Sequence, residues 1–221
     1  EFVDTNDEWI SSRTGIKERR ISDVDTSDLA TFSALKALED PNLKKEDIDL
    51  IIVATFTPHN FLPSTASVVQ KKMEMNHHVT AFDLNAACSG FIYSLTVAGS
   101  MIDSGFYKNA LVIGAEVISK TINWSDRNSC ILFGDGAGAV ILVATDEPGI
   151  LSTHLHADGK YKELLTIPAG VSENPALFQS GEAYMQMKGN EVFKMAVNTL
   201  GRIVDETLAF NNMEKSDIDW L

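Results

Sequence analysis

The sequence is poor in cysteine, in basic side chains and in long apolar runs, and each shortage excludes a class of protein. Two cysteines are too few for a disulfide framework and fit a reducing cytoplasm. Lys and Arg number 18 against 31 Asp and Glu, and the net charge of −13 disfavours nonspecific binding to nucleic acid. The longest apolar run, 137–144, has the length of a strand and falls far below the ~20 residues that cross a bilayer. We therefore expect a globular, cytoplasmic protein without a membrane segment.

The order of apolar patterns alternates between strand and helix periods, which predicts an α/β fold. No linker rich in Pro, Gly or Ser separates the segments. The predicted helices are 28–39, 64–73 with Ser64 as N-cap, one that begins near Cys88, and 191–210. The predicted strands are 50–55, 79–84, 110–114, 131–133, 139–144 and 150–156.

A short internal repeat predicts a duplicated architecture. The hexapeptides 46–51 and 216–221 share an Asp-Ile-Asp sequence at a spacing of 170 residues, and each follows a predicted helix. We expect an N-terminal half, 1–148, and a C-terminal half, 149–221, that is incomplete. By analogy with the first half, about 100 residues would follow Leu221.

Cys88 lies where the buried strand predicted at 79–84 gives way to a helix. At a helix start, unpaired backbone N–H groups and the positive end of the helix dipole favour a thiolate. A free cysteine is commonly a small buried hydrophobe, but the small residues Ala86, Ala87, Ser89 and Gly90 leave space for a substrate. These features favour a nucleophile.

The histidines do not supply an evident base for this cysteine. His77 and His78 precede the strand at its far end and are expected on the surface. His154 and His156 alternate on a predicted strand and so face the same side. Because no third ligand stands at a recognisable spacing, we expect no metal site.

The glycine run 134–139 superficially fits a dinucleotide-binding fingerprint. Such a loop must open a helix, whereas this run leads into an apolar strand. We interpret it as a glycine-rich turn that lets the backbone pack closely at the floor of a site, and we expect no nucleotide there.

Trp9 and Arg13 are four residues apart and share a face if their segment is helical. An aromatic plane beside a guanidinium can stack a nucleobase and hold a phosphate. The spacing leaves open a surface Trp that is merely covered by the Arg stem.

Taken together, these motifs resemble the β-ketoacyl-acyl carrier protein synthase III family of the thiolase superfamily, over essentially the whole chain and with both ends incomplete. The matching segments are 4–10, 13–16, 86–91, 126–127, 133–139, 154–159 and 189–194.

The resemblance implies a thiolase-like fold, in which two αβαβα halves form five layers and the second half is truncated. It also implies an acyltransferase of fatty-acid biosynthesis that condenses an acyl-CoA primer with malonyl-acyl carrier protein. No cofactor is implied beyond acyl-CoA as substrate, and a homodimer is expected.

The resemblance also assigns roles to particular residues. Cys88 would carry the acyl group, and the family's catalytic His and Asn would lie beyond the Trp220-Leu221 pair, so this segment alone would not condense substrates. Leu62 stands where some members place a Phe, which leaves a longer or branched primer open beside acetyl-CoA. The remaining implied contacts are Trp9 and Arg127 on the adenine, Arg13 and Thr5 at the phosphates, Met187, Gly189 and Phe193 along the pantetheine, and Leu165 at the acyl pocket.

Three other functions remain open from the sequence. A related thiolase-superfamily enzyme could make a quinolone, a polyketide or a long-chain ketone. A non-catalytic protein could use the same fold only to dimerise. A cysteine hydrolase would need His and Asn or Asp partners within the chain, and none is placed for it.

Overall fold

The computed structural model describes residues 3–40 and 42–221. Glu1 and Phe2, where the sequence predicts an incomplete N-terminus, lie outside the described residues. The chain forms two compact units that interleave along the sequence. One comprises 1–17, 121–132 and 147–221, and the other comprises 18–120 and 133–146. The boundary predicted between residues 148 and 149 separates two duplicated halves, not two compact units, and it stays a prediction.

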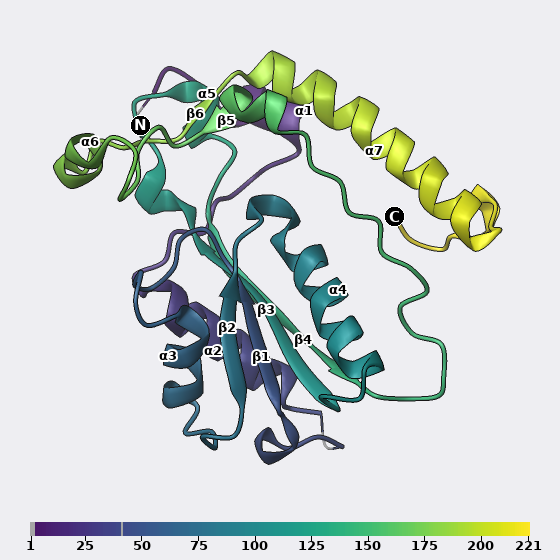
Figure 1. The fold of residues 1–221 in the computed structure, drawn as a ribbon. Helices are drawn as coiled ribbons and strands as arrows, with labels where there is room; N and C mark the ends of the chain where they lie inside the picture. Colours follow the sequence, from purple (N-terminus) through teal and green to yellow (C-terminus); the bar gives the residue numbers. More distant parts are fainter. Residues whose placement is uncertain (1–2, 41) are drawn as a thin grey trace. The chain divides into compact units, whose positions relative to one another are not determined.

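The second of these units is built on a four-stranded sheet (Figure 1). Its strands are β1 (Leu50–Ala54), β2 (Thr80–Leu84), β3 (Asn109–Val117) and β4 (Asp135–Val143), in the order β2-β1-β3-β4. β2, β1 and β3 are parallel, and β4 runs antiparallel to β3. α3 (Thr65–Lys72) connects β1 to β2, and α4 (Gly90–Asp103) connects β2 to β3. The predicted alternation of strand and helix is thus confirmed.

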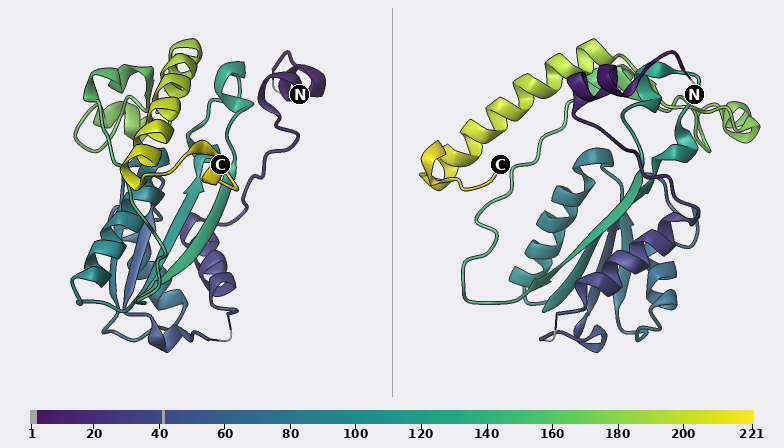
Figure 2. Two further views of the ribbon diagram at one scale, coloured as in Figure 1. Left: turned by 90° about the vertical axis from the view of Figure 1, so that its right-hand side faces the viewer. Right: turned by 180° about the vertical axis from the view of Figure 1, so that it is seen from behind.

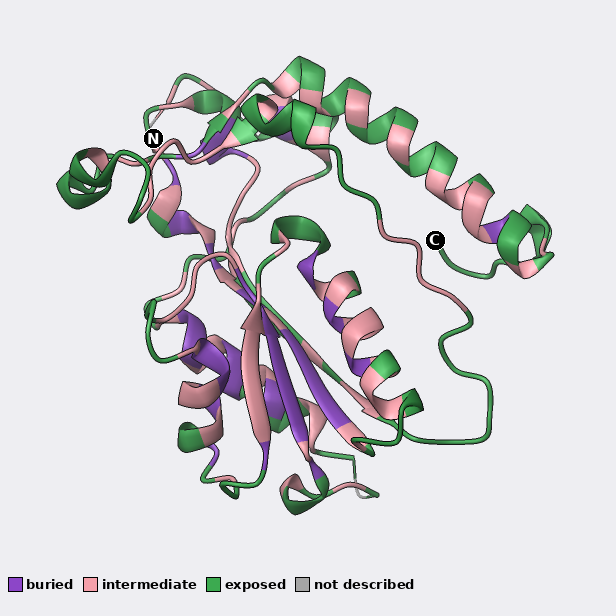
Figure 3. Cartoon of the chain, viewed as in Figure 1, coloured by how far each residue is buried: buried purple, intermediate pink, exposed green. Residues whose placement is uncertain are grey.

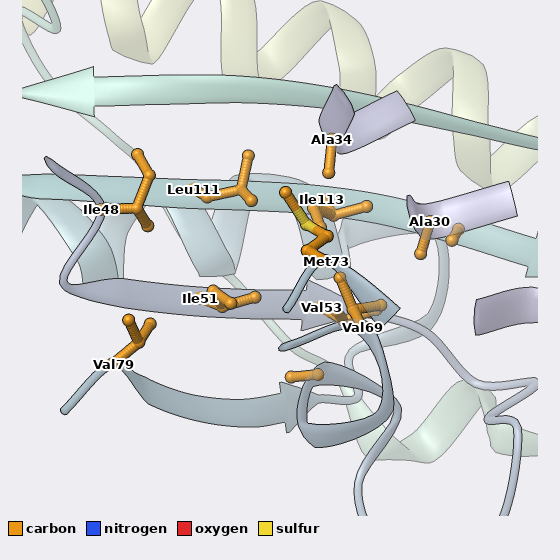
Figure 4. Packing of buried hydrophobic residues seen from close by; sticks show 12 residues of the cluster. Ala30, Ala34, Ile48, Ile51, Val53, Val69, Met73, Val79, Leu111 and Ile113 are labelled. Carbon is orange, nitrogen blue, oxygen red and sulfur yellow. The ribbon is translucent and has the colours of Figure 1, made fainter. Parts of the chain in front are cut away.

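The alternating side chains of β1 and β3 divide the core into two layers. Ile51 and Val53 pack with residues of α3 and α2 (Thr26–Ala37), whereas Leu50 and Ile52 pack with α4. The helices α2 and α3 cover one face of the sheet and α4 covers the other (Figure 1; Figure 2). Every residue of β1 is buried, as the purple ribbon of Figure 3 shows. Small residues on α2 let that helix approach the sheet closely (Figure 4). The apolar run of β1 is therefore the pattern of a strand covered on both faces.

Side-chain caps fix where these helices begin. The Ser64 hydroxyl accepts from the Ser67 N–H, as predicted, and the Asp83 carboxylate of β2 accepts from Thr65 N (2.6 Å) and Ala66 N (2.7 Å). Asp25 caps α2 by accepting from Ser27 N and Asp28 N. Burial alone would raise the Asp25 pKa, but hydrogen bonds from Ser27, Asp28 N and His59, with the charge of Lys72, hold it far below its usual range.

The other unit contains several helices and a small two-stranded sheet. Its longest element is α7 (Gly189–Asn211), which confirms the helix predicted at 191–210. β5 (Leu165–Thr166) pairs antiparallel with β6 (Gln186–Met187). The remaining helices are α1 (Asp7–Thr14), α5 (Arg127–Cys130), α6 (Pro175–Ser180), and the 3₁₀ segments Gly159–Leu164 and Lys215–Asp217. Within 3–40 and 42–221, no helix has the length and apolar character needed to cross a membrane.

Three strand predictions need correction. The segment 131–133 is not a strand, because Ile131 is the C-cap of α5 and Cys130 is buried in that short helix. The segment 150–156 is not a strand either, since it pairs with no described strand. β2 forms at the predicted place but is only partly buried, because it stands at one end of the sheet.

The two copies of the predicted repeat share their local structure. Lys45–Asp47 and Lys215–Asp217 are both 3₁₀ turns in which the carboxylate of the third residue accepts from the backbone N–H of the residue before the turn. The Asp47 carboxylate accepts from Lys44 N at 2.9 Å, and the Asp217 carboxylate accepts from Glu214 N at 2.8 Å. The two turns are therefore alike, and the duplication of whole halves stays a prediction.

Truncation at the centre of the sheet should cost most of the stability of this unit. We expect Ile51→Ala to lower the free energy of unfolding by about 2–5 kcal/mol and Ile51→Val by about 0.5–1.5 kcal/mol, because Ile51 is fully buried. Ile150→Ala, at an exposed position, should change it by less than about 0.5 kcal/mol. Urea unfolding followed by circular dichroism measures the series. Equal effects at positions 51 and 150 would contradict the assigned core.

Candidate active site

Cys88 lies in a tight turn between β2 and α4. The turn is the 3₁₀ segment Ala87–Ser89, and α4 begins at the next residue, Gly90. Ala87 adopts a left-handed φ of 45°, which costs an alanine about 1–2 kcal/mol. Its N–H donates to the Asn85 side-chain oxygen at 3.2 Å, which holds the turn. The strained turn presents Cys88 at the surface of its unit, where the thiol is exposed.

The backbone around this turn rests on the end of β1. Thr55 N donates to Leu84 O at 3.1 Å, which ties the residue after β1 to the last residue of β2. A Cβ added to Gly90 would lie 3.4 Å from the Ala54 Cβ, so the start of α4 is in close contact with β1. Because β1, β2 and β3 are parallel, the turn stands at their common carboxyl edge, where α/β proteins commonly place their sites.

The structure places Cys88 just before α4, close to the predicted helix start. No hydrogen bond or ion pair of the thiol occurs within 3–40 and 42–221. The role of Cys88 as nucleophile remains a prediction at this point, and its base is not found among the described residues.

Trp9, Arg13 and Arg127 come together in the other unit. Asn6 caps α1 by accepting from Trp9 N at 2.8 Å, and this helix sets Trp9 and Arg13 on one face, as their spacing predicts. The guanidinium carbon of Arg13 lies 4.3 Å from the Trp9 ring centroid, and that of Arg127 lies 5.0 Å from it. The indole is therefore contacted by two cationic groups, not merely by an Arg stem.

Thr5 belongs to the segment that precedes α1, and Arg127 of α5 contacts the same segment. The Arg127 guanidinium donates to Asp4 O at 3.1 Å. The Thr5 hydroxyl oxygen is buried without a hydrogen-bond partner in the described part of the chain. Buried polar atoms are normally satisfied, so this hydroxyl is an exception that no contact among the described residues explains.

The predicted apolar contacts form a second group in the same unit. Leu165 of β5 stands opposite Met187 of β6. Gly189 follows at the start of α7, and a Cβ there would lie 3.6 Å from the Met187 methyl group. Phe193 lies one turn further along α7 and is 70% exposed. The structure thus joins Leu165, Met187 and Gly189 and leaves the Phe193 ring open to solvent.

Leu62 lies between β1 and α3 in the sheet-containing unit. Its side chain is 87% exposed, so it takes no part in the core. The adjacent Phe61 is exposed as well. This part of the loop is therefore apolar and exposed.

The glycine run contributes to the sheet rather than forming a turn, which corrects the sequence interpretation. Residues from Asp135 onward belong to β4. A Cβ on Gly134 would lie 2.9 Å from Arg20 O, so glycine is required at this close approach. The Asp135 carboxylate accepts from Ser22 N (2.8 Å), Ser119 N (2.8 Å) and the Ser119 hydroxyl (2.7 Å). No helix opens from the run, which agrees with the exclusion of a dinucleotide loop.

Sequence reasoning missed Glu116, a partly buried carboxylate near the end of β3. It accepts from Phe56 N (2.8 Å), Thr57 N (3.0 Å), the Thr55 hydroxyl (3.1 Å) and the Thr57 hydroxyl. Burial raises the Glu116 pKa above its usual value, and the hydrogen bonds from Thr57, Phe56 and Thr55 oppose that rise. The available signal was a single acid within the apolar strand pattern of 109–117.

His154 and His156 do face the same side, as predicted, and there they meet a carboxylate. Glu206 of α7 lies 3.0 Å from the His154 Nδ1 and 2.9 Å from the His156 Nε2. These hydrogen bonds, that of His156 foremost, lower the Glu206 pKa. No group of three or more potential ligands among the described side chains is arranged to hold a metal ion.

Comparison with known proteins identifies the class and then the family. A profile described as 3-oxoacyl-[acyl-carrier-protein] synthase III matches residues 82–159. Two bacterial proteins named β-ketoacyl-[acyl-carrier-protein] synthase III align with the whole chain. The one from Thioalkalivibrio sulfidiphilus is 54% identical and the one from Thiobacillus denitrificans is 56% identical. The chain covers 69% and 68% of their lengths, respectively.

Solved structures show the same likeness. The 3-oxoacyl-[acyl-carrier-protein] synthase III of Aquifex aeolicus matches 98% of this chain with a TM-score of 0.88 and 45% identity, and the chain covers 67% of it. The corresponding Pseudomonas aeruginosa enzyme gives a TM-score of 0.88 at 37% identity, with 98% of this chain and 66% of that one covered.

The fold and these likenesses define a thiolase-like α/β enzyme of the acyltransferase class. More narrowly, the chain belongs to the β-ketoacyl-acyl carrier protein synthase III family.

The Glu206 contacts predict a specific dependence of stability on pH. The folded-state pKa of Glu206 is lowered, so its contribution is present above the ordinary Glu value of about 4.3 and is lost as pH falls through the folded value. Glu206→Gln should therefore be less stable than the parent at pH 6, and the difference should shrink below about pH 4. Thermal unfolding across this range measures it, with Glu182→Gln as the exposed control. A difference that grows on acidification would contradict the assigned contacts.

Proposed function

We propose that this chain provides the acyl-accepting part of a β-ketoacyl-acyl carrier protein synthase III that initiates fatty-acid biosynthesis. Its reaction is a decarboxylating Claisen condensation of an acyl-CoA primer, acetyl-CoA in the first place, with malonyl-acyl carrier protein. The observation that carries the proposal is the exposed Cys88 in a strained turn at the carboxyl edge of a parallel sheet. Membership of the family supplies the reaction.

Cys88 acts as the nucleophile in this proposal. Its thiolate attacks the thioester carbonyl of acyl-CoA, CoA leaves as a thiolate, and the acyl group stays on the Cys88 sulfur. Malonyl-acyl carrier protein then loses CO₂, and the resulting enolate attacks the acyl carbonyl and releases the Cys88 thiolate. Backbone N–H groups at the start of α4 are suited to stabilise the oxyanion of each tetrahedral intermediate.

The cluster around Trp9 is proposed to bind the nucleotide end of CoA. An indole plane can stack on the adenine, and Arg127 lies beside that ring. Arg13 would bind the nucleotide phosphates, with Thr5 nearby. These assignments need no metal or cofactor.

The apolar residues are proposed to receive the rest of the substrate. Met187, Gly189 and Phe193 would line the path of the pantetheine arm. Leu165 stands across from Met187 and would border the acyl group. Leu62 would influence which primers fit, since its side chain is exposed and smaller than Phe.

A cytoplasmic homodimer completes the proposal. The scarcity of cysteine suits a reducing compartment. The apolar tip formed by Phe61 and Leu62 would gain from burial in a contact between subunits. The halves 1–148 and 149–221 are likewise proposed as duplicated parts.

Acyl transfer to Cys88 tests the proposed function directly. The full-length protein incubated with acetyl-CoA should gain one acetyl mass on the peptide that contains Cys88, and Cys88→Ser should abolish the adduct. Cys130→Ser is the matched control and should leave acetylation intact, because Cys130 is buried away from solvent. Acetylation of the Cys88→Ser variant, or none in the parent, would overturn the assignment.

Trp9 variants test the CoA-binding cluster separately. Trp9→Ala should weaken acyl-CoA binding by about 1–3 kcal/mol, the range for loss of one base–aromatic stack. Trp9→Phe should lose less, because it keeps an aromatic plane. Calorimetric titration with CoA measures both, and thermal unfolding verifies that each variant is folded. Equal affinity for CoA in the parent and Trp9→Ala would place the adenine elsewhere.

A further inference from the structure

We propose that Glu116 is a positioning residue that fixes the end of β1, and thereby both the Cys88 turn and the loop that carries Leu62. The inference rests on the proposed function, because that function assigns roles to Cys88 and Leu62. Its physical basis is one carboxylate that accepts hydrogen bonds from three consecutive residues.

The Glu116 carboxylate is surrounded by donors from one short segment. Its two oxygens accept from the backbone N–H groups of Phe56 and Thr57 and from the hydroxyls of Thr55 and Thr57. Hydrogen bonds to an ionised acceptor are roughly twice as strong as neutral ones. A single side chain thus determines the path of the backbone as it leaves β1.

Further hydrogen bonds hold the same segment, residues 55–57, in place. Thr57 N also donates to the Thr55 hydroxyl at 3.1 Å, and Val117 N donates to the Thr57 hydroxyl at 2.9 Å. The Thr26 hydroxyl donates to Thr57 O at 2.6 Å. The segment is therefore held from β3 on one side and from α2 on the other.

Residues 54 and 55 also contact the backbone on both sides of the Cys88 turn. Thr55 donates its hydroxyl to Glu116 and its N–H to Leu84 O, four residues before the cysteine. Ala54, next to Thr55, is the residue against which Gly90 packs. A change in the backbone at 54–55 therefore changes the support on both sides of the Cys88 turn.

The loop that carries Leu62 begins at the same segment. The loop leaves the Glu116 contacts at Thr57 and returns to the structure where His59 N donates to the Thr65 hydroxyl at 3.1 Å. Between these anchors and α3, Phe61 and Leu62 are exposed. The hydrogen bonds thus fix the base of the loop, and Leu62 is exposed beyond it, where it would contact a primer.

Two pairs of variants test the inference. Glu116→Gln replaces the carboxylate by an amide that presents N–H donors to N–H donors, whereas Glu116→Asp keeps the charge. Thr55→Val removes one hydroxyl donor with little change of shape, and Thr55→Ser restores it. Glu163→Gln, at an exposed position, is the control for removal of a carboxylate.

Amide hydrogen exchange and cysteine labelling provide the readouts. Glu116→Gln should speed exchange at Phe56 and Thr57 by at least roughly tenfold, the factor that one hydrogen bond to a charged group supplies, and leave Ile52 within the strand protected. It should also change the rate at which iodoacetamide labels Cys88. Thr55→Val should show both effects more weakly, and Glu116→Asp and Thr55→Ser should lie nearer the parent.

The outcomes distinguish a positioning role of Glu116 from a general loss of stability and from a failure of the proposed function. Unchanged exchange and labelling in a folded Glu116→Gln or Thr55→Val would overturn the inference. Faster exchange throughout β1 and β3 would also overturn it, because that pattern reports loss of stability. In the full-length enzyme, Glu116→Gln should shift the ratio of kcat/KM for acetyl-CoA against longer acyl-CoA, and Glu163→Gln should not. Failure of the parent to form acyl-Cys88 would instead refute the proposed function, while the exchange result stands.

Discussion

The burial of β1 on both faces is the constraint on which the candidate site depends. Its five residues are covered by α2 and α3 on one side and by α4 on the other. A strand held in this way cannot shift by one residue without moving apolar side chains into the wrong layer. Its carboxyl end is therefore a fixed base for the Cys88 turn, which can hold a left-handed alanine because its surroundings are rigid.

Buried and partly buried carboxylates complete what apolar packing begins. Glu116, Asp83 and Asp135 each accept from two backbone N–H groups, and Asp49 does the same for Lys108 N and Asn109 N. Asp83 caps the start of α3, whereas the other three carboxylates join strands or fix residues next to a strand end. Part of the acidic excess of this chain is thus structural, and it satisfies N–H groups where the regular sheet ends.

The sequence predicts well the features that depend on local spacing. The strand at 50–55 is a short continuous apolar run and the helix at 191–210 has a clear helical period. The four-residue spacing of Trp9 and Arg13 requires only that α1 is a helix. The run at 131–133 has the same apolar composition as a short strand, and periodicity alone cannot separate that from the end of a buried helix.

Features that depend on distant partners are not readable in the same way. Glu116 is separated from Thr55 by 61 residues, so its contacts appear only in the fold. Arg127 is assigned to the predicted site from the family resemblance, because its spacing from Trp9 gives no signal. The Glu206 contact of His154 and His156 likewise spans about 50 residues of chain.

The most direct test of the account is the reactivity of Cys88 toward iodoacetamide at neutral pH, read peptide by peptide beside a free thiol standard. The account predicts that Cys88 reacts at least as fast as the standard, because it is exposed in a turn at a helix start, and that buried Cys130 reacts far more slowly. Labelling of Cys88 as slow as that of Cys130 would show an inert thiol and would contradict its role as the acyl carrier.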